Sequence, residues 1–158
     1  MSLAEEKAYY KKYYTGMNSP SAGATLPELT GTGPEGPWRL SLADSNKRMA
    51  ILFFASDCRA WEQNWAAWNK LLNNRDISSR FLLVATTERV PIQYLDAHKV
   101  GGKRVFIGLD KRWQALYRLA ATPQTIVEYR GTVQKPWLGV LSDSDVQEIE
   151  SALKQRGQ

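Results

Sequence analysis

The chain has very few of the residues that build disulfides and metal sites. Its 158 residues include one cysteine, Cys58, and one histidine, His98. A single cysteine excludes any disulfide within the chain, and one cysteine with one histidine cannot form a tetrahedral metal site. A serine triad is disfavoured because His98 lies on a polar helical stretch. We therefore expect no metal and no required cofactor.

Long apolar runs and blocks of one charge are also missing. No stretch reaches the roughly 18–20 apolar residues of a membrane span, and the charged start of the chain is not that of a signal peptide. The net charge is +5, but the basic residues are scattered among 16 acidic ones, which does not indicate nucleic-acid binding. An apolar fraction of 43% with six tryptophans is enough for one well-packed domain.

Residues 1–24 are expected to form an N-terminal extension to a domain over 25–158. Met1–Leu3 is typical of a cloning remnant. A basic and aromatic cluster follows it, and such clusters are common where a chain leaves a membrane. The favoured explanation of the cluster is a short solvated helix packed on the domain by its tyrosines. The cluster consists of Lys7, Tyr9, Tyr10, Lys11, Lys12, Tyr13 and Tyr14.

The hydrophobic pattern predicts strands that alternate with helices, as in an α/β layered domain. Apolar or alternating runs predict strands at 38–42, 48–55, 80–85, 105–108, 125–129 and 132–133. Helical spacing predicts helices at about 58–73, 91–99, 110–120 and 142–153. Residues 15–37 are predicted to be a loop, because they are rich in glycine and proline.

The stretch Gly31–Gly36 fits the dinucleotide-binding pattern G-x-G-x-x-G. Its context argues against that function, because the pattern requires a preceding strand and a following helix. We therefore expect no nucleotide site here.

Cys58 is the main candidate for chemistry. It follows the apolar run 49–55 and stands at the start of a predicted helix, where the helix dipole favours the thiolate. Arg59 favours the thiolate if its side chain turns inward. Asp57 opposes the thiolate or else caps helix amides.

The order of the predicted elements resembles the thioredoxin-like fold, and within it the TlpA/ResA-like thiol-disulfide oxidoreductases of the redoxin group. The resemblance lies in Ile51–Cys58, the helix 61–72, Ala121–Ile126 and the Arg130–Gly131 turn, and it covers about 25–155. It implies a three-layer sandwich: a central mixed sheet with a C-terminal β-hairpin and flanking helices.

The chain departs from that family at the active site. Trp61 stands where the family has its second cysteine, Ala60 where it has proline, and Asn64 where it has a buried glutamate. Leu52 stands where thioredoxins have a buried aspartate. We therefore expect no carboxylate beneath Cys58 to relay protons.

The resemblance also implies a substrate groove opposite Cys58. Pro123, preceded by Thr122, matches the family's cis-proline, which faces the cysteine and can hold an extended peptide. Trp61 has two interpretations that are compatible: core packing with the other helix tryptophans, or a wall of the groove.

Three functions remain open from the sequence. The first is thiol-disulfide exchange in monothiol mode through Cys58, a role in cell redox homeostasis with thiol- or disulfide-bearing proteins or glutathione as partners. The second is a non-catalytic binding module that has lost CxxC chemistry. The third, a thiol peroxidase, lacks the expected proline and threonine before Cys58. The resemblance implies an extracytoplasmic location, periplasmic or anchored to a membrane by a tether outside this chain.

Overall fold

The computed structural model describes residues 22–26, 28–44, 46–55, 59–87, 104–116 and 123–155, without the side chains of 59–62, 104, 115 and 116. The predicted helix at 91–99 lies outside these ranges. The strands are β1 (Leu29–Gly33), β2 (Gly36–Leu40), β3 (Met49–Phe54), β4 (Phe81–Ala85), β5 (Arg104–Ile107), β6 (Gln124–Tyr129) and β7 (Thr132–Leu138). The helices are α2 (Arg59–Leu72), α4 (Lys111–Leu116) and α5 (Asp143–Lys154), with a single 3₁₀ turn, Ser78–Arg80.

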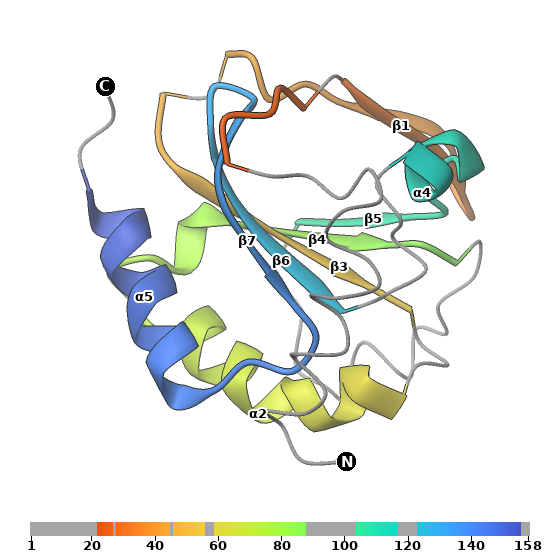
Figure 1. The fold of residues 1–158 in the computed structure, drawn as a ribbon. Coiled ribbons are helices and arrows are strands. Elements are labelled where there is room, and N and C mark those ends of the chain that lie inside the picture. The colour runs from red at the N-terminus through yellow and green to blue at the C-terminus, as the bar shows by residue number, and fades with distance from the viewer. Residues whose placement is uncertain are drawn as a thin grey trace.

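The main sheet has five strands in the order β5-β4-β3-β6-β7 (Figure 1). Strand β3 lies at its centre, parallel to β4 and antiparallel to β6. The apolar run of β3 is continuous because both faces of a central strand are covered, and five of its six residues are buried. The predicted mixed α/β sheet is therefore confirmed.

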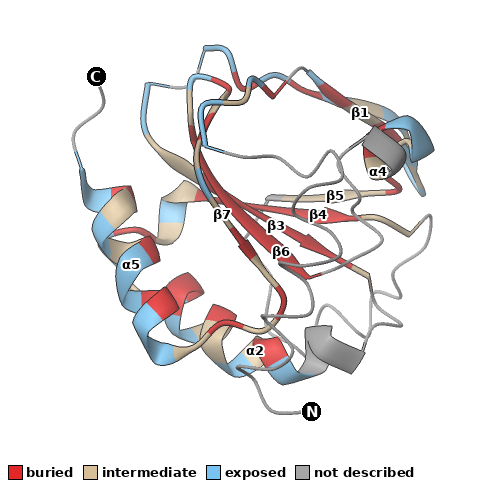
Figure 2. Ribbon diagram, viewed as in Figure 1, coloured by how far each residue is buried: buried red, intermediate tan, exposed pale blue. Residues whose placement is uncertain are grey.

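Two apolar layers cover the sheet, one on each face (Figure 2). On one face, helices α2 and α5 pack against alternate residues of the strands, including Leu52, Phe54 and Val127. On the other face, β1, β2 and α4 pack against the residues between them, such as Ile51 and Ile126. Alternation of side chains between the faces of a strand produces this division.

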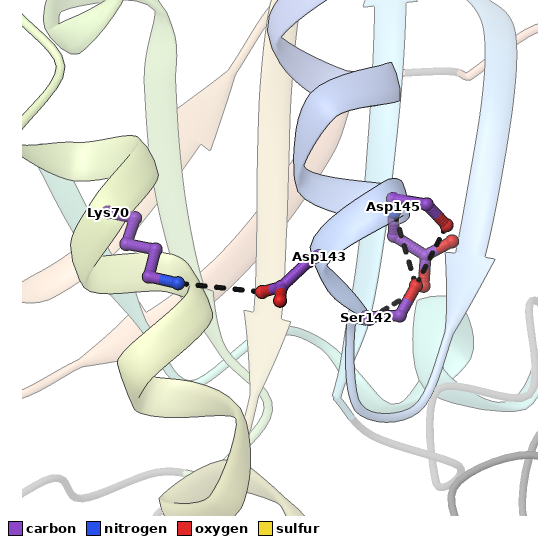
Figure 3. A network of polar contacts seen from close by, with 5 residues as sticks. Lys70, Ser142, Asp143 and Asp145 are labelled. Carbon is purple, nitrogen blue, oxygen red and sulfur yellow. Dashed lines mark hydrogen bonds and ion pairs between the residues drawn. The ribbon is translucent and has the colours of Figure 1, made fainter.

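Helix α5 begins with a capping box (Figure 3). The Asp145 N–H donates to the Ser142 hydroxyl (3.2 Å), and the Ser142 N–H donates to the Asp145 carboxylate (2.9 Å). Asp143 on the same turn accepts a hydrogen bond from Lys70 of α2 at 3.4 Å. The helix predicted over 142–153 is confirmed, and the capping box fixes where α5 starts beside α2.

Residues 29–40 form a β-hairpin, β1 paired antiparallel with β2, so the prediction of a loop was wrong over 29–37, while the strand predicted from residue 38 agrees with the end of β2. Its glycines serve close packing rather than turns alone. A Cβ on Gly31 would lie 2.4 Å from the Trp38 ring and 2.5 Å from the Gly108 carbonyl oxygen. The hairpin can therefore lie directly against the end of β5, where the Trp38 indole N–H donates to the Ile107 carbonyl (2.6 Å).

Strands β6 and β7 form the predicted tight hairpin. Arg130 and Gly131 at its turn both have positive φ, 51° and 84°, as a two-residue turn between twisted strands requires. Strand β7 extends to Leu138, further than the predicted 132–133.

Strand β7 is the last strand of the sheet. At its start, Val133 exchanges backbone hydrogen bonds with Gly23 and Ala24, each 2.8 Å. At its other end the Gly139 N–H donates to the Pro123 carbonyl, so alternate residues of β7 point their backbone groups away from β6. Pro136 is one of these residues, and its missing N–H therefore faces outward.

Candidate functional site

The candidate site lies at the edge of the sheet where β3 and β4 end and β6 begins. Phe53 of β3 pairs with Gln124 of β6, and Phe54 pairs with Ala85 of β4. The Thr86 N–H then donates to the Phe54 carbonyl at 2.8 Å. The chain that leaves β3 toward Cys58 and the chain that enters β6 from Pro123 therefore meet at one edge.

Several of the predicted site residues lie outside the described part of the chain: Asp57, Cys58 and Thr122. Helix α2 begins at Arg59, directly after Cys58, as the sequence predicted. The backbones of Arg59 and Trp61 belong to this helix, but their side chains are not among those described. The roles assigned to these five residues stay predictions.

Pro123 is buried at the start of β6. Its carbonyl oxygen accepts a hydrogen bond from the Gly139 N–H at 2.9 Å, which ties the beginning of β6 to the end of β7. This hydrogen bond therefore fixes the carbonyl group of Pro123 to the sheet.

Asn64 of α2 is fully buried, with 0% of its surface exposed. Its Oδ1 accepts a hydrogen bond from the Leu141 N–H at 2.8 Å, while its Nδ2 is buried with no acceptor. The amide thus joins the helix that follows Cys58 to the segment between β7 and α5. Its spacing with Trp68 places it on the inward face of α2, but no pattern in the sequence identified its backbone partner.

Trp68 is the second link between α2 and the site edge. Its ring is fully buried and meets Phe54 edge-on, with ring centroids 6.4 Å apart. Its indole N–H donates to the Thr125 hydroxyl at 3.3 Å. The prediction that Trp68 packs in the core is confirmed, and the hydrogen bond also fixes the helix along β6.

Gln114 of α4 is a site-edge residue that sequence reasoning missed. Its side-chain amide donates to the carbonyl oxygens of Thr86 and Leu109, each at 2.8 Å. It thus holds the chain just after β4. The helix predicted over 110–120 includes this residue, but the sequence gave no signal for the contacts of the glutamine side chain.

Glu128 is a buried carboxyl on β6, with 0% of its surface exposed. Its Oε2 accepts a hydrogen bond from the Gly131 N–H at 2.8 Å, and its Oε1 is buried with no partner. Burial raises the pKa of Glu128 from 4.5 to about 7, and the Gly131 hydrogen bond opposes this rise. Glu128 pairs with Met49, at the opposite end of β3 from Phe54, so it does not lie beneath the site.

Among the described residues, no group of three or more histidine, cysteine, aspartate and glutamate side chains is arranged to hold a metal ion. Within the same ranges, no helix is both long and apolar enough to cross a bilayer.

The chain matches no family model and no curated protein. Solved structures do match it. The thioredoxin domain of a thiol-disulfide oxidoreductase from Bacteroides vulgatus has a TM-score of 0.60 at 16% identity, covering 86% of this chain and 100% of that one. A thiol:disulfide interchange protein from Bacteroides sp. gives 0.62 at 15%, covering 88% and 94%.

StoA from Bacillus subtilis is similar to the same extent, with a TM-score of 0.57 at 14% identity over 84% of this chain and 98% of StoA. These likenesses show a thioredoxin-like fold, as the sequence predicted, and the structural neighbours include a thiol-disulfide oxidoreductase and a thiol:disulfide interchange protein.

Proposed function

We propose that this thioredoxin-like domain acts in thiol-disulfide exchange in monothiol mode, with Cys58 as its single attacking thiol. The observation that supports the proposal is that α2 begins at Arg59, the residue after Cys58 in the sequence. Strand β3, which precedes this segment, ends beside the start of β6, where Pro123 is buried. A thiol at a helix start is favoured as the thiolate by the helix dipole.

The exchange proceeds in two balanced steps. The Cys58 thiolate attacks one sulfur of a partner's disulfide, a mixed disulfide forms, and the partner's other sulfur leaves as a thiolate. Because the chain has no second cysteine, a thiol from glutathione or from a partner protein must attack the mixed disulfide and release Cys58. Partners are therefore proteins that carry thiols or disulfides, or glutathione.

The test is alkylation of the folded protein by iodoacetamide as a function of pH, with glutathione disulfide as a parallel challenge. We expect rapid alkylation near pH 7 and one glutathione bound per chain, read by intact mass. Cys58→Ser is the control and should gain neither adduct. Alkylation that accelerates only after denaturation would refute a reactive Cys58.

The active-site departures favour a second candidate, a binding module that keeps the groove without the chemistry. Asn64 is buried and accepts a hydrogen bond from Leu141, but its side chain is not titratable. Glu128 cannot supply a titratable group at the site, because it lies beside the opposite end of β3. Trp61→Cys separates the two candidates. If the edge is competent for redox chemistry, this variant should reduce insulin as a dithiol; a folded but inactive variant favours the binding module.

The proposal also includes the location of the protein in the cell. Resemblance to the TlpA/ResA group supports an extracytoplasmic protein, and the basic and aromatic residues 7–14 suit a segment near a membrane surface. Vesicle co-sedimentation with and without anionic lipid, using the chain and a version lacking residues 1–21, would test the membrane-proximal part.

A further inference from the structure

A groove of about 600 Å³ lies between the edge strand β7 and helix α5, on the face of the sheet that α2 and α5 cover. It does not include Pro123 or Asn64. Side chains from three parts of the chain line it, among them Arg48, Gln134, Lys135, Trp137, Glu148 and Ser151. Its volume is that of a small-ligand site, roughly 300–1,000 Å³.

Arg48 is a cation in this groove without an acidic partner among the described residues. Its Nη1 donates to the Gln134 side-chain oxygen at 3.0 Å, and its guanidinium lies 6.0 Å from the centre of the Tyr129 ring. Its Nε is buried and has no acceptor. The edge formed by Nε and Nη2 is the fork that arginine uses to bind a carboxylate with two parallel hydrogen bonds.

Trp137 provides a second buried N–H donor without an acceptor. Only 6% of its surface is exposed, and its indole N–H is buried without an acceptor. An unpaired buried polar group costs about 1–3 kcal/mol, and the great majority of such groups in native proteins are paired. Arg48 and Trp137 both line this groove, and the covered, unpaired N–H that each carries points to acceptors brought by a ligand.

The other charged residues that line the groove do not neutralise Arg48. Lys135 and Glu148 form an ion pair across the groove at 2.5 Å, and the Lys135 ammonium lies 5.3 Å from the centre of the Trp137 ring. Because this pair is neutral, the described residues that line the groove carry one net positive charge, that of Arg48. A ligand with a carboxylate complements it.

The separation of the two donors indicates an elongated ligand. Trp137 pairs with Thr125, which pairs with Leu52, four residues along the sheet from Arg48. At about 3.3 Å per residue, their backbones are about 13 Å apart. The Arg48 guanidinium lies beside Tyr129 and Gln134, at its own end of this span, so a ligand that reaches both donors must be elongated, as an extended peptide is.

We propose that the groove between β7 and α5 binds an extended peptide, with a peptide carboxylate on the Arg48 fork and a backbone carbonyl on the Trp137 indole N–H. Both N–H groups are covered in the empty groove, so binding requires side-chain rotations of Arg48 and Trp137. The site is independent of Cys58, and Cys58→Ser protein should bind the peptide equally well.

The test is titration of ¹⁵N-labelled protein, followed by the Arg48 Nε–H and Trp137 indole N–H resonances. The probes are acetyl-Glu-Ala-Ala-Ala-amide, which has an acidic side chain, and acetyl-tetraalanine with a free C-terminal carboxylate. The control is acetyl-Gln-Ala-Ala-Ala-amide. At least one carboxylate probe should shift both resonances and saturate below about 10 mM, and the one that binds more tightly identifies the source of the carboxylate.

Variants make the assignment specific. Arg48→Gln should weaken binding by about tenfold, because it removes the charged fork. Arg39→Gln is the matched control, since Arg39 is an exposed arginine of β2, and it should leave the affinity unchanged. Trp137→Phe keeps the ring and should weaken binding several-fold, while Glu148→Gln should strengthen it by freeing Lys135.

Three outcomes would overturn the proposal. They are no saturation with either carboxylate probe, equal binding of the glutamine control, and equal losses in the Arg48→Gln and Arg39→Gln variants.

Discussion

The buried carboxyl of Glu128 makes the stability of the domain depend on pH in the neutral range. The folded protein holds the proton up to about pH 7, whereas an exposed glutamate loses it near 4.5. Between these values the folded state binds more protons than the unfolded state, so the free energy of unfolding falls as the pH rises. Above pH 7 both states are ionised and this contribution is fully lost.

The size of the effect follows from the pKa values. A change from 4.5 to about 7, at about 1.4 kcal/mol per unit, corresponds to an upper limit of roughly 3–4 kcal/mol of stability lost between pH 4.5 and 8. Local relaxation of the β6–β7 hairpin would reduce this loss of stability. Glu128→Gln removes the ionisation and keeps an oxygen that can accept the Gly131 N–H hydrogen bond.

Urea unfolding at pH 4.5, 6, 7 and 8, followed by circular dichroism, measures the difference between wild type and Glu128→Gln. We expect similar stability at pH 4.5 and a variant that is more stable by about 2–3 kcal/mol at pH 8. Glu35→Gln, at an exposed position between β1 and β2, controls for the loss of one charge. A constant difference between wild type and Glu128→Gln at all four pH values would refute this account of Glu128.

Two further changes test the contacts that position the site edge. Asn64→Ala leaves the buried Leu141 N–H without its acceptor and should destabilise the domain by about 1–3 kcal/mol, measured by urea unfolding; a loss below 0.5 kcal/mol would show that the contact is dispensable. Gly31→Ala should cost about 1–3 kcal/mol and shift the Trp38 indole resonance, because the new Cβ would clash with that ring, and an unchanged resonance would contradict the close packing.

The sequence predicts the elements that local rules determine. The continuous apolar run of β3 is typical of a strand covered on both faces, and Arg130–Gly131 has the length of a tight hairpin turn. Ser142 has the acidic residue three positions later that completes a capping box. In each case the signal lies within a few residues of the structure that it determines.

Contacts between distant residues were not predictable in the same way. Gly31 and Gly33 read as loop residues, yet they belong to β1 because the hairpin packs against β5, more than 70 residues later. Nothing near Asn64 in the sequence indicates that Leu141 is its partner, and nothing near Glu128 indicates that its carboxyl is buried. At the site, the sequence predicted a helix that starts at Cys58 and the structure has α2 from Arg59, while the placement and chemistry of Cys58 stay predictions.

Pro136 has a consequence for the outer border of the sheet. A strand from another molecule that aligned with β7 would need a regular row of donors and acceptors, and the proline interrupts that row in mid-strand. Since Gly23 and Ala24 already occupy the first part of the border, only a short length remains for such an approach. Growth of the sheet into fibrils or strand-exchanged pairs is therefore disfavoured on this side.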